Sequence, residues 1–433
     1  MSGETIAWLF AYDLVVVVFV ALFARSILTF FHPLFWYLIW HLAANTLRLL
    51  KLTGEQNFLY TDSVSFLPVT TDEIVRAMLW NDIALLMFLI GSVMGHMVKK
   101  PRADRARYLQ PSMRTVKIVS LWMFPPGLVF FVLLRFVPRA VFDQLGVGSY
   151  AIIVGMWPLT LTCILIYFLG FRKILIVMAG TFLLVLALQG YHRFMVIIPS
   201  IYLALLYLLR SPARFKPLKL LIPSALLMFI MPYMKQMGRA FQAGDYAGTI
   251  DILFSALRFQ GGASSPVNFL DQFAAALTLI DHSEKLWYGA TYLNLLLLPI
   301  PRALWPDKPS LGQHVLEIAT VDRPFDAEGR IITMLGESYI NFGTAGIIIV
   351  PAIVAYLFTR LYLRFTRSPK YSLIRLFYLF VLPASVQMYR DGITSIVLFG
   401  LIFNMPLIFL WLGTRRNVSA GQPQQVQRTE IDA

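Results

Sequence analysis

The segment 299–343 decides how the rest of the chain is interpreted. It begins with PIPRALWPDKPSLGQHV (299–315) and, after a spacer, ends with GRIITMLGESYINFG (329–343). Its charged side chains make it too polar to cross a lipid bilayer, and the apolar run that follows can cross one. Trp305 and the prolines favour an ordered, packed loop, because a flexible linker would be rich in Ser and Gly. The sequence therefore predicts ionisable side chains held at a membrane surface.

The composition indicates a membrane protein. The chain has 433 residues, of which 58% are hydrophobic and only 14% are charged, whereas a soluble chain carries roughly 25% charged residues. Its formal charge of +14 lies in loops between apolar runs. We therefore attribute this charge to membrane topology and expect no nucleic-acid partner.

Apolar windows of about 20 residues predict about eleven transmembrane helices. Backbone groups inside hydrocarbon must satisfy their own hydrogen bonds, and these runs lack the alternation of strands, so helices are the only option. We expect an all-α polytopic membrane protein with helices at 5–24, 27–48, 77–98, 115–134, 150–171, 174–190, 194–210, 219–234, 345–363, 372–389 and 392–412.

Lys and Arg residues orient the predicted helices. The loops after the third, fifth, seventh, ninth and eleventh helices are basic, and all of them lie on one side of the membrane. By the positive-inside rule that side is cytoplasmic, which places the N-terminus outside and the C-terminus inside. The predicted parts are transmembrane helices one to eight (1–234), a large extracytoplasmic loop (235–344), helices nine to eleven (345–412) and a disordered cytoplasmic tail (413–433).

The large extracytoplasmic loop is the only part of this topology that can form a soluble subdomain. It contains apolar patches that are too short to span a membrane, at 250–259, 268–280 and 292–301. We expect interfacial or re-entrant helices at these patches.

Arginines on the predicted outward face need a reason to be there, because the positive-inside bias acts against them. Arg193 is the sharpest example, since it follows His192 between two apolar runs with hardly any loop. One interpretation is snorkelling to lipid phosphates, or a local ion pair between Arg390 and Asp391. The other is that several guanidinium groups converge on one anionic group, such as a pyrophosphate. The arginines concerned are Arg135, Arg139, Arg193, Arg239, Arg302 and Arg390.

The acidic and histidine residues do not predict a metal site or any other cofactor. The large loop has no DxD cluster, the histidines lack ligand spacing, and the single cysteine, Cys163, excludes an intrachain disulfide. We expect His32 and His41 to pack against aromatic side chains near a helix end. His192 and His314 are candidates for proton transfer.

Glu337 is the carboxylate that we single out as a catalytic base. It precedes the predicted ninth helix by about two turns, so partial burial would strengthen it as a base. The structural alternative is a capping role, or an ion pair with Arg330. Tyr339, Asn341 and Gly343 behind it are typical of interface packing and of the start of a helix. Catalytic motifs such as GxSxG, Walker A and HExxH are absent from the sequence.

Four motifs occur in a recognisable order, namely GYHR (190–193), RALWPDKP (302–309), GESYINFG (336–343) and RDG (390–392). Combined with the topology, they resemble the Wzy-type O-antigen polymerases, also called oligosaccharide repeat unit polymerases. The resemblance covers about residues 150 to 412, and the part before it agrees only in being hydrophobic. One departure is the outward N-terminus, because many relatives keep both ends inside.

The resemblance implies a metal-independent glycosyltransferase with a GT-C-like fold in the bacterial cytoplasmic (inner) membrane. Such an enzyme moves a growing glycan from one undecaprenyl-pyrophosphate carrier onto a new lipid-linked repeat unit, outside the membrane. Its partners would be the lipid-linked donor and acceptor, membrane lipids and a chain-length regulator. The resemblance implies that Arg193, Arg302 and Arg390 bind the pyrophosphate, with Lys308 assisting. From the residues themselves we add Arg135, Arg239 and His314 as further candidates for substrate binding, and Glu337 and His192 as candidates for the base.

Other functions fit parts of the sequence. An O-antigen ligase uses a similar fold and a large outward loop to attach finished polymer to a lipid core. A transporter or flippase would show inverted repeats and charged groups at mid-membrane, whereas here the ionisable groups are expected at one face and no repeat is visible. A purely structural membrane subunit would not require so many outward arginines.

Overall fold

All regular elements in the described part of the chain are helices, and several are long and apolar enough to cross a membrane. These candidate spans are Glu4–Phe23, Asp72–Met97, Met113–Leu134, Ala151–Leu169 and Met334–Arg367. They indicate an all-α membrane protein. The structure, a computed structural model, describes residues 3–46, 48–49, 70–98, 108–137, 141–142, 148–189, 194–210, 233–257, 269–283, 286–297, 300, 304–305, 333–395, 400 and 404–419.

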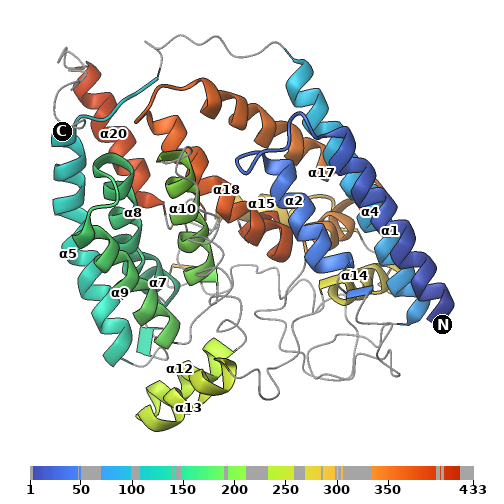
Figure 1. Ribbon diagram of the computed structural model, residues 1–433, viewed down its shortest axis with the longest axis horizontal. Coiled ribbons are helices and arrows are strands. Elements are labelled where there is room, and N and C mark those ends of the chain that lie inside the picture. The colour runs from blue at the N-terminus through green and yellow to red at the C-terminus, as the bar shows by residue number, and fades with distance from the viewer. Residues whose placement is uncertain are drawn as a thin grey trace. The chain divides into compact units, whose positions relative to one another are not determined.

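The chain divides into two compact units, each built from segments far apart in the sequence (Figure 1). The first unit comprises Met1–Arg102, Val267–Arg367 and Ala384–Phe399. Its helices are α1 (Gly3–Phe23), α2 (Pro33–His41), a π-helical turn η1 (Leu42–Thr46), α4 (Thr71–Met97), α14 (Phe269–Ser283), α15 (Ala290–Leu297), α17 (Met334–Arg367), the end of α18 (Leu373–Asp391) and α19 (Ile393–Ser395).

The second unit comprises Ala103–Pro266, Ser368–Pro383 and Gly400–Ala433. Its helices pack through aromatic contacts, for example the stacked rings of Tyr202 and Phe380, whose centroids lie 4.0 Å apart. They are α5 (Met113–Phe136), α7 (Gly148–Gly155), α8 (Trp157–Leu169), α9 (Lys173–Gln189), α10 (Phe194–Arg210), α12 (Met234–Gln242), α13 (Tyr246–Leu257), the start of α18 and α20 (Met405–Ser419).

Most of the predicted helices correspond to observed ones. Those at 5–24, 77–98, 115–134, 150–171 and 345–363 correspond to the five candidate spans. Those at 174–190, 194–210 and 372–389 are α9, α10 and α18. The predicted helix 27–48 begins later, at Pro33, after a turn. The predicted helix 219–234 lies almost wholly outside the described residues, and 392–412 does so in part. The count of eleven and the GT-C-like arrangement therefore stay predictions.

Short helices occupy the three apolar patches of the predicted extracytoplasmic loop. The described parts of these patches belong to α13, α14 and α15. Their place at a membrane surface stays a prediction, as do the boundaries of the loop and the orientation of both termini.

The first unit exposes apolar side chains and buries a charged one, as expected of a protein in lipid. On α1 the side chains of Trp8, Val15 and Leu22 are 64–71% exposed, whereas Asp13 is fully buried. A soluble protein would bury the apolar side chains and leave the carboxylate in water. This pattern supports the membrane assignment independently of helix length.

Close backbone contact joins α4 to α17 (Figure 1). A Cβ added at Gly91 would lie 2.1 Å from the carbonyl oxygen of Ala352, and one at Gly95 would lie 2.8 Å from Cβ of Thr359. Gly91 and Gly95 form a GxxxG motif, whose small residues let two membrane helices approach closely. A larger side chain at Gly91 would force α4 and α17 apart.

The helix α17 is interrupted at Gly343, where φ is 60° and ψ is −146°. The short first part, 334–342, folds against the second, since a Cβ on Gly346 would lie 2.1 Å from the carbonyl oxygen of Ser338. A φ of this sign with such a ψ is accessible only to glycine. Gly343 therefore fixes the direction of the short helix that contains Glu337.

Candidate functional site

Only part of the predicted site falls in the described residues. Arg239 is exposed on α12, and Arg135 belongs to α5, with its side chain outside the described part; both lie in the second unit. Glu337 and Arg390 lie together in the first unit. The convergence of the predicted arginines therefore stays a prediction. The candidate residues outside the described part are His192, Arg193, Arg302, Lys308 and His314, and Arg139 and Arg330 also lie outside it.

The carboxylate of Glu337 is fully buried and is held by donors from two other segments. Its Oε1 accepts a hydrogen bond from Thr291 Oγ1 at 3.1 Å. Its Oε2 accepts from the backbone N–H groups of Ile393 and of Thr394, the latter at 3.4 Å. Both oxygens thus have a donor, which is what a buried carboxylate requires. The capping alternative is confirmed, since the carboxylate binds the first N–H groups of α19.

Backbone and side-chain contacts fix the helix on which Glu337 lies. Asn341 Nδ2 donates to Thr291 Oγ1 at 2.7 Å and to the carbonyl oxygen of Glu337 at 2.8 Å. The N–H groups of Trp287 and Tyr288 donate to the carbonyl oxygens of Ile340 and Asn341, at 3.1 and 2.9 Å. These bonds satisfy carbonyls that the end of a helix leaves unpaired.

The RDG motif forms the turn that meets Glu337. The helix α18 ends at Asp391, and Gly392 has a φ of 93° while its N–H donates to the carbonyl oxygen of Met388 at 2.9 Å. A glycine in this conformation is a common helix C-terminus. The chain then turns so that the N–H groups of the next two residues reach Glu337. Two predicted motifs, GESYINFG and RDG, are thus brought together.

Arg390 lies beside this turn with its side chain 27% exposed. Its Nε is 3.2 Å from Oδ1 of Asp391, so the local ion pair is confirmed. Its guanidinium also lies over the ring of Phe269, 5.8 Å from the centroid, at a distance typical of a cation–π contact. Because the side chain is only partly covered, the guanidinium can still contact a ligand, and phosphate binding stays a prediction.

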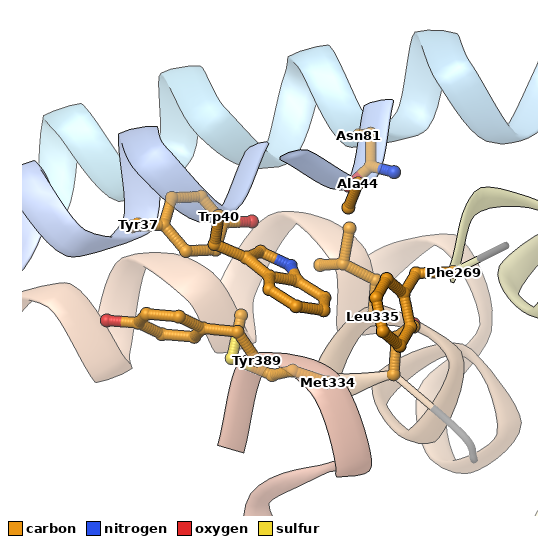
Figure 2. A pocket seen from close by; sticks show the side chains of 9 residues that line it. Tyr37, Trp40, Ala44, Asn81, Phe269, Met334, Leu335 and Tyr389 are labelled. Carbon is orange, nitrogen blue, oxygen red and sulfur yellow. The ribbon is translucent and has the colours of Figure 1, made fainter. Parts of the chain in front are cut away.

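An aromatic cavity lies next to Arg390 and is drawn in Figure 2. Phe269, over which Arg390 lies, is also one of its walls, and its ring is 4.7 Å from that of Trp40. The volume of about 10 Å³ is roughly what one water molecule needs. The lining residues are Tyr37, Trp40, Ala44, Asn81, Phe269, Thr333, Met334, Leu335 and Tyr389.

Two ion pairs hold α14 against the rest of the first unit. Arg48 forms a bidentate pair with Asp271, with Nε–Oδ1 and Nη2–Oδ2 distances of 3.0 and 2.9 Å, and both side chains are buried. Arg76 pairs with Asp281, and the hydroxyl of Tyr339 donates to Asp281 at 2.7 Å. Bidentate geometry is the strong form of such pairs. Two acids of the predicted loop therefore have fixed partners in the first unit.

A second polar cluster, missed in the sequence, lies between α1, α2 and α4. His41 Nε2 is 2.9 Å from Asp13 Oδ1 and 3.2 Å from Asp82 Oδ1, and all three side chains are buried. His41 lies at the end of α2 as predicted, but its partners among the described residues are Asp13, Asp82 and Asn45, and the predicted aromatic packing is not observed there. The expectation that ionisable groups gather at one face is also wrong, since Asp13 and Asp82 lie inside candidate spans. Charged residues within apolar runs were the available signal.

His32 behaves as predicted. Its ring lies 4.9 Å from that of Tyr362 and 5.4 Å from that of His96, and the two imidazole Nε2 atoms are 3.2 Å apart. His32 also caps α2, since its Nδ1 accepts from the N–H of Leu34 at 3.2 Å. The two histidines of this chain region thus have opposite surroundings: aromatic for His32 and acidic for His41.

Comparison with known proteins returns no match, whether against family models, curated proteins or solved structures. The function is therefore argued from the residues and their geometry.

Proposed function

We propose that this protein is a membrane glycosyltransferase that polymerises undecaprenyl-pyrophosphate-linked repeat units into a surface polysaccharide, on the extracytoplasmic face. The observation that carries the proposal is the meeting of two motifs, in which Glu337 of GESYINFG binds the turn that follows Arg390 of RDG. These are two of the four motifs on which the sequence resemblance rests. Such a contact is what a shared site requires, although Glu337 and Ile393 are 56 residues apart in the sequence.

The chemistry is a displacement at the anomeric carbon of the donor glycan. A hydroxyl oxygen of the acceptor unit forms the new bond, the bond to the pyrophosphate oxygen breaks, and the electron pair leaves with the lipid pyrophosphate. The hydroxyl proton passes to a base. Fixed guanidinium groups stabilise the charge that develops on the leaving group, which is worth several kcal/mol in a water-poor site.

In this proposal Arg390 contacts the pyrophosphate, together with Arg193, Arg302 and Lys308. Glu337 positions Arg390 by fixing the turn behind it. Both carboxylate oxygens already accept hydrogen bonds and the side chain is fully buried, which favours this positioning role over direct proton transfer. His192 and Glu337 stay the candidates for the base.

The test uses a strain that lacks the gene and is complemented with variants. Arg390→Ala should reduce polymer at least about tenfold, and Arg390→Lys should restore it only in part, because Lys lacks the bidentate fork. The matched control is Arg364→Ala, which removes an exposed arginine at the other end of α17. Protein amounts in the membrane are compared by immunoblot. Normal polymer from Arg390→Ala would contradict the role of Arg390.

The product of the deletion strain separates the related functions. Single repeat units on the lipid core indicate a lost polymerase, whereas a core without any sugar polymer or repeat indicates a lost ligase. Purified protein in liposomes, with lipid-linked substrate on the outer face only, separates enzyme from transporter. Polymer formed there supports the proposal, and no reaction despite folded protein contradicts it.

A further inference from the structure

In the polar cluster between α1, α2 and α4, the described residues supply fewer hydrogen-bond donors than acceptors. Asp13 is well provided, since its Oδ1 accepts from His41 Nε2 at 2.9 Å and Asn45 Nδ2 at 2.5 Å, and its Oδ2 accepts from Thr46 Oγ1 at 2.5 Å. No hydrogen-bond donor among the described residues is directed at either carboxylate oxygen of Asp82. In the described part of the chain, the basic side chain that lies close to Asp82 is His41, which it shares with Asp13.

This imbalance is unfavourable without a further cation. Asp82 is 1% exposed, so water does not solvate its carboxylate, and an uncompensated buried charge costs several kcal/mol. The amide oxygen Oδ1 of Asn45, fully buried beside the same carboxylates, likewise has no hydrogen-bond partner in the described part of the chain. Two acceptor groups, from α4 and η1, are thus buried without donors at one point.

We propose that Asp13, His41 and Asp82 bind a divalent first-row transition-metal ion that joins α1, α2 and α4. Each side chain offers one ligand atom, and these atoms lie within 4.8 Å of one another. One imidazole nitrogen and two carboxylates suit zinc, manganese or iron, whereas magnesium and calcium prefer oxygen ligands alone. Asn45 supplies an amide oxygen as a further ligand once its side chain turns.

The distances fit an ion of this class. The Nε2–Oδ1 separations of 2.9 Å to Asp13 and 3.2 Å to Asp82 are close to the edges of about 3.0–3.4 Å expected around a metal with bonds of ~2.1 Å. Thr46 holds the second oxygen of Asp13, which is how outer hydrogen bonds orient metal ligands.

The charges also balance. Two carboxylates and a neutral imidazole neutralise a divalent ion, and the protons that leave Nε2 and the carboxylates go to solvent as the metal binds. The metal-free alternative is a cationic imidazole and one proton shared by the two acids. Both states are neutral, so the metal ion competes with protons for the same groups. Metal binding therefore weakens as the pH falls.

The role is structural and does not depend on the proposed sugar transfer. The three ligands come from the first helices of the chain, and none belongs to the Glu337 and Arg390 site. Metal content and thermal stability can therefore be measured whether or not the polymerase proposal holds.

The experiment determines the metal content of the full-length protein in detergent, purified without a polyhistidine tag. We expect about one equivalent of metal per chain. A chelator should remove it and lower the Tm, and Zn²⁺ should restore the Tm. Replacement by Co²⁺ should give visible absorption bands of a nitrogen and oxygen site. The variants His41→Gln and Asp82→Asn should lose the metal, and the matched control His32→Gln, at a buried histidine outside the cluster, should keep it.

Wild-type protein decides the question if the variants fail to fold. The proposal is overturned if metal-stripped wild-type protein gains neither Tm nor a Co²⁺ spectrum at micromolar metal, and the cluster is then a shared-proton site. Metal that His41→Gln retains at the wild-type level would equally overturn it, because the ion would then lie elsewhere.

Discussion

Two buried carboxylates of the first unit, Glu337 and Asp82, are surrounded in opposite ways. Glu337 accepts a hydroxyl hydrogen bond on one oxygen and backbone N–H bonds on the other. Asp82 accepts no well-directed hydrogen bond from any described residue, although it is buried to nearly the same degree. Equal burial therefore does not mean equal function.

Glu337 is a carboxylate whose hydrogen bonds hold a turn in place, whereas Asp82 is a carboxylate that needs a metal ion or a proton to compensate its charge. The donors around Glu337 are backbone groups of a turn and a threonine, so the protein itself completes that site. Among the described residues only the imidazole of His41 lies close to Asp82, and Asp13 shares it, so we expect a metal or a proton to complete this site. Substitutions at and around the two carboxylates test this contrast, beginning with the one expected to change stability most.

Replacing Glu337 should have the largest effect. Glu337→Leu leaves the Thr291 hydroxyl and the N–H groups of Ile393 and Thr394 buried without an acceptor, at roughly 1–3 kcal/mol each. We expect a loss of stability on the order of 4 kcal/mol and a loss of polymer, measured by thermal unfolding in detergent and by the glycan ladder of complemented cells.

Glu337→Gln separates the two roles of this residue. Its amide oxygen can still accept from the backbone N–H groups, so we expect the turn, the Tm and much of the polymer to be retained. A variant with wild-type Tm but as little polymer as Glu337→Leu would instead make Glu337 the base.

Gly343→Ala should come next, because it disturbs the Glu337 helix without touching the Asp82 cluster. The nearest atom to an added Cβ is 3.8 Å away, so space is available and the cost lies in the backbone. A non-glycine residue in this region costs roughly 1–3 kcal/mol. The control is Gly180→Ala in α9, where an added Cβ meets nothing within 4 Å; it should be neutral or stabilise by up to about 1 kcal/mol. Equal Tm values for Gly343→Ala and Gly180→Ala would show that a non-glycine residue at position 343 is not strained.

Several features of the region around Glu337 could be predicted from the sequence. Long apolar runs predicted the helices, and the polar GESYINFG and RDG segments stood out against them. Gly343 was expected at the start of a helix, and it does precede the long part of α17. The contact between the two motifs was not predictable, since nothing in one sequence says that residue 337 meets residue 393.

The cluster around Asp82 was not predicted, for a different reason. Asp13, His41 and Asp82 are far apart in sequence, so the search for ligand spacing found nothing, although helices can bring distant ligands together as readily as near ones. The GxxxG motif at Gly91 and Gly95 was an unused signal for the packing of α4 on α17. Partners in a helical bundle depend on which faces meet, and the apolar faces of these helices are too alike to decide it.

His32 gives a pH effect of intermediate size that does not involve the carboxylates. Burial and the neighbouring His96 lower the pKa of His32 to about 3, whereas an unfolded histidine has a pKa of about 6.5. The unfolded chain therefore binds a proton that the folded protein excludes. Stability is complete above pH ~6.5 and falls as the pH drops below it, continuing towards pH ~3.

The variant His32→Asn keeps a side chain able to cap α2 but cannot titrate. Between pH 7.5 and pH 5.5 we expect the Tm of wild-type protein to fall by a few degrees more than that of His32→Asn, roughly the effect of 1 kcal/mol. Parallel curves of Tm against pH for wild-type protein and His32→Asn would show that the imidazole titrates alike in the folded and unfolded states.

Asp82→Asn in metal-stripped protein should change the stability least, and this near-zero effect is the sharpest contrast with Glu337. Asn has the same shape as a protonated Asp, and its amide can donate to Asp13 in place of the proton that the two acids share in the metal-free state. We expect a change within about 1 kcal/mol, towards greater stability. In protein loaded with Zn²⁺ the same substitution should be destabilising, because it deletes a ligand. A substitution whose sign depends on the metal cannot be explained by packing, since packing is the same in both. A large loss of stability in the metal-stripped protein would mean that the protein itself satisfies Asp82, and the contrast with Glu337 would disappear.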